Sequence, residues 1–300
     1  MFENIDEIIA EAPEGFDGSA ETPAALHLFD IDEAKPTMDA ARIEKYHHLT
    51  AKLLYLSKRA RPDIQTAVSF LCTRVKGPTE DDWKKLQRTI RYLQSSKWLP
   101  LTLEAGGSGD IKWWVDASYG VHSDYRGHTG GTLTLGKGHQ YSSSTKQKIN
   151  TRSSTESELV AVDDLMPNIL WTRLFIKAQG YKVNGNTIYQ DNKSTILLAS
   201  NGKASSGKRT KHINIRYFFI TDRVAKGEVD IKHCPTNNML ADFFSKPIQG
   251  SLFREQRKAI LNLEFDDITG YGPGGYKPAT SQECVGRKSQ RNQNEGKSQE

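Results

Sequence analysis

The sequence predicts an α/β protein in which a mixed five-stranded sheet is flanked by helices and preceded by a small all-α subdomain. Between residues 42 and 100, apolar residues recur at the three- and four-residue spacing of amphipathic helices. From residue 111 onward, short runs rich in tryptophan and β-branched residues replace that spacing, as expected of strands. Beyond residue 154, helical and strand patterns alternate, which favours a sheet with helices packed across it.

The all-α subdomain is expected to hold three helices within residues 42–100. The first ends before Pro62 and the second ends at Gly77, because proline and glycine interrupt the helical pattern there. The third opens with Thr79 and Asp82, which have the spacing of a capping box with Asp in the usual position of Glu. Each helix carries one apolar stripe, so the three should pack together as one unit.

The sheet domain is expected over residues 108–264. Its elements are, in order, strands over residues 111–117, 130–135 and 140–144, a helix over 154–178, a strand over 186–190, helices over 193–199 and 212–225, a strand over 229–234 and a short helix over 238–245. Pro167 falls inside the long helix, and we expect a kink there because proline removes a backbone donor.

Both ends of the chain are expected to be largely disordered. Residues 1–41 are interpreted as an acidic linker, since the first 34 residues hold ten Asp or Glu and no Lys or Arg. Residues 265–300 consist mainly of Gly, Ser, Gln, Asn and Lys, a composition that buries too little apolar surface to fold.

The charge of the chain points to a polyanionic partner. The formal net charge is +5 although the first 34 residues are acidic, so the remainder is strongly basic and favours nucleic acid. The three cysteines show no paired spacing and are expected to be reduced thiols of an intracellular protein. The longest apolar runs are too short to cross a bilayer, so no membrane partner is expected.

Four carboxylates stand at positions that suggest chemistry. Asp116 and Asp191 end apolar strands, and ligands gather at strand ends of this kind in open sheets. Glu158 borders the apolar stripe of the long helix, whereas Glu156 is rotated by about 200° and shares another face. Asp242 lies within an apolar segment. Each acid also has an ordinary structural explanation. Asp116 and Asp191 can form turns, and Asp242 can cap a helix or pair with Lys246. Glu158 can stabilise the start of its helix through the helix dipole.

Convergent carboxylates suit phosphodiester hydrolysis. Two Mg²⁺ ions ~3.5–4 Å apart activate a water and stabilise the leaving oxygen, and they prefer oxygen ligands. No zinc-like spacing of His and Cys competes with this interpretation. The four acids are therefore expected to bind two Mg²⁺ ions, for which Mn²⁺ can substitute, with water as the nucleophile.

Four motifs follow one another along the sheet domain. They are S-S-T-K-Q-K at residues 143–148 with S-S-T-E-S-E-L-V-A at 153–161, D-N-K-S at 191–194, R-T-K-H-I-N-I-R-Y at 209–217 and L-A-D-F-F-S-K-P at 240–247. This series resembles the ribonuclease H domains of copia-type LTR retrotransposon polyproteins, in which the functional Glu heads an E-x-x-A pattern that maps onto Glu158. Residues 53–64 and 83–93 resemble the helices that connect the reverse transcriptase to the nuclease, so the resemblance covers about residues 42–264.

The resemblance implies a ribonuclease H-like fold and an endonuclease that hydrolyses the RNA strand of RNA–DNA hybrids during reverse transcription. It implies that Asp116, Glu158, Asp191 and Asp242 are the catalytic metal ligands. An upstream reverse transcriptase polymerase domain is the implied partner, and its active site is expected before residue 42. A virus-like particle in the cytoplasm is the implied location, with the nucleus as an alternative.

Two details of the resemblance leave questions open. Asp163 and Asp164 superficially match a polymerase V-D-D motif, but they fall inside the long helix and are given no polymerase role. Cellular ribonucleases H often have a mobile His before the last acid. Whether His233 or Asn237 takes that part here stays open.

Basic residues around the acids are expected to contact phosphates, which position a nucleic acid without reading its sequence. The candidates are Lys146, Lys148, Arg209, Lys211, His212 and Arg216. Solvated surface charge is the alternative, and His212 and Arg216 could instead pair with acids. The basic residues of the all-α subdomain, among them Arg61, Lys85, Arg88 and Arg91, are expected to face outward and touch nucleic acid as well.

Two other functions remain open. A DNA transposase or integrase can share the fold, although such enzymes typically place their acids in the order Asp, Asp, Glu. This chain has the order Asp, Glu, Asp, Asp. A catalytically silent nucleic-acid-binding module would keep the fold without activity.

Overall fold

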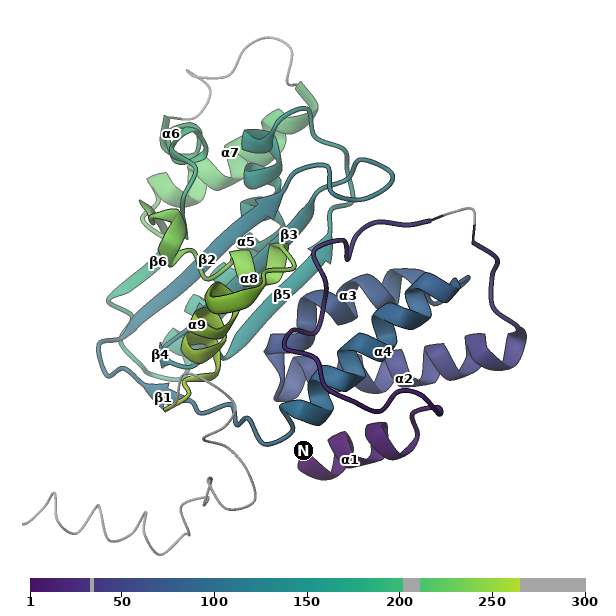
Figure 1. The fold of residues 1–300 in the computed structure, drawn as a ribbon. Coiled ribbons are helices and arrows are strands. Elements are labelled where there is room, and N and C mark those ends of the chain that lie inside the picture. Colours follow the sequence, from purple (N-terminus) through teal and green to yellow (C-terminus); the bar gives the residue numbers. More distant parts are fainter. Residues whose placement is uncertain (33–34, 202–210, 265–300) are drawn as a thin grey trace, which may run out of the picture.

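The computed structural model describes residues 1–32, 35–201 and 211–264. Figure 1 shows a helical unit beside a sheet unit, with the last helices of the chain lying across the sheet. The expected disordered tail, residues 265–300, falls outside the described residues. In the described part, no helix combines the length and the apolar character needed to cross a membrane.

The helical unit contains the three expected helices, one further α-helix and a short 3₁₀ helix. Its elements are α1 (Phe2–Ala10), α2 (Ala40–Arg59), the 3₁₀ helix η1 (Pro62–Ile64), α3 (Gln65–Arg74) and α4 (Glu80–Ser95). The capping box is confirmed, because Thr79 and Asp82 satisfy each other's backbone at the start of α4. The apolar stripes meet in one core that includes Leu53, Val68 and Leu86.

The N-terminal segment is ordered, and the expectation of a disordered linker over residues 1–41 is wrong for its described part. Ile5 and Ile8 of α1 and Phe16 enter the core of the helical unit. Leu28 and Phe29 pack in a second cluster with α3 residues. The segment contains apolar residues at helical spacing in spite of its acidic composition. Their burial against α2, α3 and α4 stabilises the segment.

The N-terminal segment also covers the basic side of α4. Arg88 Nε donates to the Thr22 carbonyl at 3.2 Å, and Arg91 Nε donates to the Asp17 carbonyl at 3.0 Å. Lys85 is buried and donates to the carbonyl of Asp30. The expectation that these residues face outward toward nucleic acid is therefore wrong, because their side chains turn to carbonyl groups of the same chain.

Ordering of the N-terminal segment can be tested by removing one methylene. Ile8→Val should lower the free energy of unfolding by about 1 kcal/mol, because Ile8 is buried. Leu26→Val is the matched control and should have no measurable effect, since Leu26 is 76% exposed. Urea denaturation measures both. Equal stability of the wild type and Ile8→Val would show that α1 does not contribute to the fold.

The sheet unit confirms the expected mixed five-stranded sheet. Its strands are β2 (Asp110–Ser118), β3 (His128–Thr134), β5 (Tyr141–Lys146), β6 (Gly185–Gln190) and β7 (Asp230–His233), in the spatial order β5-β3-β2-β6-β7. The first three pair antiparallel, and β6 and β7 run parallel to β2. A separate two-stranded ribbon joins β1 (Glu104–Ala105) to β4 (Gly136–Lys137).

Helices cover both faces of the five-stranded sheet (Figure 1). α5 (Ser154–Ala178) has the expected bounds, continues through Pro167, and packs on the face that carries Trp113 and Val115. The opposite face carries Trp114 and meets η3 (Thr236–Asn238), α8 (Asp242–Ser245) and α9 (Gly250–Leu261). α6 (Lys193–Asn201) and α7 (Lys211–Ala225) follow β6. Helix α9 was not predicted from the sequence.

Glycine in β3 lets α8 approach the sheet. A Cβ atom on Gly130 would lie 2.6 Å from both the Ala241 carbonyl oxygen and the Ser245 nitrogen. Gly130 pairs with Asp116 in the neighbouring strand. A larger residue at Gly130 would therefore push α8 away from the strand end that carries Asp116.

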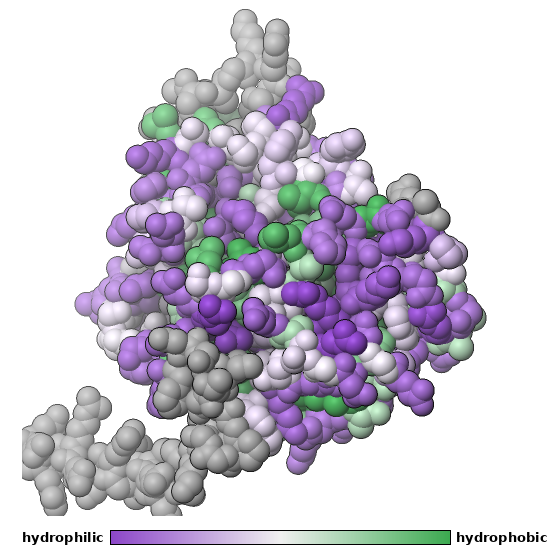
Figure 2. Space-filling view, viewed as in Figure 1, coloured by the Kyte–Doolittle hydropathy of each residue, from purple (hydrophilic) through white to green (hydrophobic). Residues whose placement is uncertain are grey.

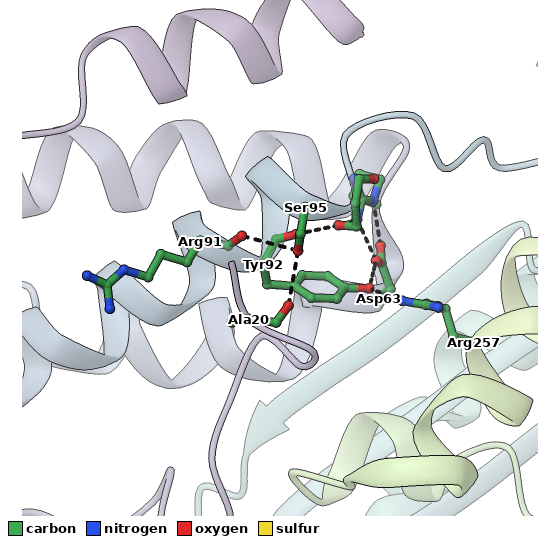
Figure 3. A network of polar contacts seen from close by, with 8 residues as sticks. Ala20, Asp63, Arg91, Tyr92, Ser95 and Arg257 are labelled. Atoms are coloured by element: carbon green, nitrogen blue, oxygen red, sulfur yellow. Dashed lines mark hydrogen bonds and ion pairs between the residues drawn. The ribbon is translucent and has the colours of Figure 1, made fainter. Parts of the chain in front are cut away.

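The two units share one core. Phe243, Phe244 and Phe253 from α8 and α9 belong to the same apolar cluster as the helices of the helical unit. Figure 3 shows a polar network at this junction, in which Tyr92 donates to Asp63 at 2.6 Å and Arg257 of α9 donates to the Tyr92 hydroxyl at 3.1 Å. The visible surface of both units is mainly hydrophilic, with a few hydrophobic side chains near the middle of the view (Figure 2).

Candidate functional site

Three of the expected acids meet at one end of the sheet. Asp116 lies near the end of β2, Asp191 directly follows β6, and Glu158 lies in the first turns of α5. Each offers one carboxylate oxygen, and the three oxygens lie within 4.8 Å of one another. Asp116 is 1% exposed and Glu158 is 6% exposed, whereas Asp191 is half-buried. β2 and β6 are parallel neighbours, so their carboxyl ends lie side by side at the same end of the sheet.

The fourth acid, Asp242, adjoins this cluster through Lys246. The Lys246 Nζ atom lies 2.7 Å from Asp242 Oδ1 and 3.2 Å from Asp116 Oδ2. The Ser245 hydroxyl of α8 donates to the Asp116 carboxylate. The ammonium group thus offsets part of the negative charge where α8 meets β2.

Further side chains hold the acids in place. Gln190 Nε2 donates to Glu158 at 3.2 Å, while Gln190 Oε1 accepts the backbone N–H of Asp191 at 2.8 Å. The Thr236 hydroxyl donates to Asp191 at 3.1 Å. Sequence reasoning missed Gln190, Thr236 and Ser245 as site residues, although Gln190 directly precedes Asp191 in the motif segment.

The structure places Glu158, and not Glu156, beside the other acids. Glu156 turns back to the start of α5, where its carboxylate accepts the backbone N–H of Arg152 at 2.7 Å. Glu158 joins the acidic cluster instead. The face argument from helical periodicity predicted this difference correctly.

The carboxylates perturb one another. Burial, together with the negative charges of Asp116 and Asp191, raises the pKa of Glu158 well above its ordinary value. Burial and the neighbouring Asp116 also raise the pKa of Asp242 to about 7. Closely spaced carboxylate oxygens are the donor set that a divalent cation fits, because the cation offsets their repulsion. The site is therefore compatible with a divalent metal.

The raised pKa of Asp242 should be visible in the pH dependence of stability. A carboxyl group with a raised folded-state pKa stabilises the fold below its unfolded pKa and loses this contribution as pH rises through the folded pKa. In EDTA, the wild type should therefore lose stability relative to Asp242→Asn between pH 3.8 and about 7. The relative loss should be on the order of 4 kcal/mol by urea denaturation. Parallel stability curves for the two proteins would contradict the raised pKa.

Two of the expected phosphate-binding residues form ion pairs within the chain, and one is exposed. Lys146 pairs with Asp124 at 2.7 Å, and Lys148 is exposed. Arg216 pairs with Asp163 at 3.3 Å and also with Asp164, as the alternative interpretation allowed. Lys211 and His212 begin α7, and Arg209 lies outside the described residues.

The residues considered for a mobile His role lie beside the site. His233 is the exposed last residue of β7, and Asn237 lies in η3 next to Thr236. Among the described residues, neither side chain forms a hydrogen bond or an ion pair with the carboxylates.

The mixed sheet and the acids at its edge define a ribonuclease H-like domain. The Pol polyprotein from transposon RE2 of Arabidopsis thaliana is 31% identical over 218 residues, which is 72% of this chain and 15% of the relative. The Pol polyprotein from transposon RE1 of the same plant is 32% identical over 70% of this chain and 14% of its own length. The chain belongs to the copia-type retrotransposon Pol polyproteins.

The chain spans about a seventh of the length of these two relatives. No protein-family model matches it. Among solved structures, a ribonuclease H1 isolated from compost aligns with a TM-score of 0.33 and 15% identity, over 45% of this chain and 91% of that chain.

Proposed function

We propose that this chain is a metal-dependent endonuclease that cuts the RNA strand of RNA–DNA hybrids during retrotransposon reverse transcription. The observation that carries the proposal is the meeting of Asp116, Glu158 and Asp191 within 4.8 Å, beside Asp242. Membership of a retrotransposon Pol family supports the choice of nucleic acid as substrate.

The four acids would hold two Mg²⁺ ions, or Mn²⁺ in their place, which when bound supply an activated water and stabilise the leaving oxygen. Gln190 would keep the Glu158 carboxylate oriented, and Thr236 would do the same for Asp191. Lys246 neutralises charge between Asp116 and Asp242 and would turn away as cations take over that role. The buried positions of Asp116 and Glu158 would limit access of water to a phosphate bound there.

Basic residues around the site would bind the phosphates of the hybrid. Lys146 ends β5, Lys148 follows that strand, and Arg216 lies on α7. The same sequence motif as Arg216 also contains Arg209, Lys211 and His212. Arg216 would exchange its pairing with Asp163 and Asp164 for a phosphate. Such contacts position the hybrid, while its shape and 2′-hydroxyls distinguish it from DNA.

A reverse transcriptase polymerase domain is the proposed partner, because the relatives are Pol polyproteins. A cytoplasmic virus-like particle, or the nucleus, is the proposed location. Polymerase and nuclease would then act on the same hybrid in turn.

A gel assay with labelled substrates tests the proposal. With Mg²⁺ the purified chain should cleave the RNA strand of a hybrid, and should leave duplex DNA and duplex RNA intact. EDTA should stop cleavage. Tight hybrid binding without cleavage would favour a silent binding module, and cleavage of duplex DNA would favour a transposase-type nuclease.

A further inference from the structure

We propose that the cavity between the sheet and α9 binds an unpaired nucleobase. The cavity has a volume of about 490 Å³, within the range of small-molecule sites. It lies on the face of the sheet opposite α5. Its lining includes Trp114, Tyr189, Cys234, Asn237 and Gln256.

Two aromatic rings give this cavity a flat wall. The rings of Trp114 and Tyr189 lie 5.1 Å apart with an interplanar angle of 27°, and both side chains are half-buried. The His139 ring also contacts Trp114, with ring centroids 5.5 Å apart. A further planar ring can stack on such a pair of half-exposed rings. Stacking on aromatic side chains accepts any base.

A buried amide supplies the hydrogen-bonding part of the site. Gln256 is 3% exposed, and its Nε2 donates to the Met239 carbonyl at 3.3 Å. Its Oε1 atom is buried without a hydrogen-bond partner among the described residues. An unpaired buried acceptor is unfavourable. Because Gln256 lines the cavity, a rotation of its amide would offer this acceptor to a ligand N–H. A nucleobase is planar and carries N–H groups, so it meets both requirements of this cavity.

The cavity adjoins the acidic cluster along two strands. Trp114 lies two residues before Asp116 on β2, so these two side chains share a strand face. Tyr189 lies on β6, two residues before Asp191, which directly follows that strand. Two residues of strand span ~7 Å, about the spacing between neighbouring nucleotides in an extended strand. A nucleotide next to the acids could thus place its base in the cavity, provided that the base is unpaired and its ring face is free.

The proposal is tested without divalent ions, so that it is independent of cleavage. Adenosine is titrated in EDTA and followed by ligand-detected NMR, with ribose 5-phosphate as a probe that lacks the base. Adenosine should bind and ribose 5-phosphate should not. Tyr189→Leu removes the stacking ring, and Gln256→Leu removes the acceptor while keeping its volume. Each should weaken adenosine binding by about 10-fold or more.

The matched control is a stacked pair elsewhere on the surface. Trp171 stacks on Phe175 at 4.9 Å and is 62% exposed, so Trp171→Leu should leave adenosine binding unchanged. A second arm compares hybrids with and without a single-stranded overhang, again in EDTA. A preference for the overhang that Tyr189→Leu abolishes assigns the base to the nucleic acid. Adenosine binding with no such preference assigns the site to free nucleosides or nucleotides.

Two results would overturn the proposal. One is the absence of adenosine binding by the wild type at millimolar concentration. The other is unchanged binding in both Tyr189→Leu and Gln256→Leu, each checked by circular dichroism for a folded state. Loss of cleavage activity, by contrast, would bear only on the proposed nuclease function.

Discussion

Asp116→Asn is expected to reduce cleavage of the hybrid by about 10²–10⁴-fold while leaving hybrid binding largely intact. Asp116 is 1% exposed and contributes an oxygen to the cluster with Glu158 and Asp191. Asparagine keeps the size of the side chain, so Ser245 can still donate to it and the fold should persist. The substitution removes one negative charge from the cation ligands and also relieves repulsion among the acids.

The measurement is single-turnover cleavage of labelled hybrid with saturating Mg²⁺, together with binding of the same hybrid in EDTA. Asp110→Asn, at the opposite end of β2, is the matched control and should cleave at the wild-type rate. Wild-type cleavage by Asp116→Asn would refute the role of the acidic cluster. Loss of hybrid binding in the variant would instead point to a structural effect.

Asp63→Ala is expected to lower the free energy of unfolding by about 3–5 kcal/mol. Arg61 is 1% exposed, and two of its nitrogens donate to Asp63 at 2.8 and 2.7 Å. Burial alone would raise the pKa of Asp63, but the Arg61 guanidinium and the Tyr92 hydroxyl lower it below its ordinary value. Removing the carboxylate leaves the Arg61 charge buried without its partner.

Urea denaturation measures this loss. Glu104→Ala breaks an exposed pair with Lys137 at 3.2 Å and should cost at most about 1 kcal/mol. The double variant Arg61→Met with Asp63→Leu removes both charges and should recover much of the stability. Equal effects of Asp63→Ala and Glu104→Ala would show that the buried pair is no stronger than a surface pair.

Local signals explain how much of the fold was predictable. The start of α4 follows from its capping box, and the bounds of α5 follow from the serine before it and a long helical pattern. The order of α1 and the presence of α9 depend on partners far along the chain. Ile8 and Phe253 are buried only because they enter the shared core. The residues of that core are far apart in the sequence, so no short stretch of sequence reveals it.

The same division applies to the site. Strand ends and helical periodicity indicated Asp116, Asp191 and Glu158, because each position is defined by its own segment. The groups that hold them were not predictable in this way. Ser245 reaches Asp116 across 129 positions of sequence, and only the folded topology brings the two together.

The core shared by the helical unit and α9 also sets the order in which the chain can fold on the ribosome. Leu93 and Phe253 belong to one apolar cluster, yet 160 residues separate them. At ~5–20 residues per second, synthesis of that interval takes roughly 10–30 s. During this time the finished α2–α4 helices would lack the Phe243, Phe244 and Phe253 side chains that complete their core. The nascent helical unit would therefore expose the apolar surface that these side chains later cover. A chaperone that shields this surface from aggregation would raise the yield of folded chains.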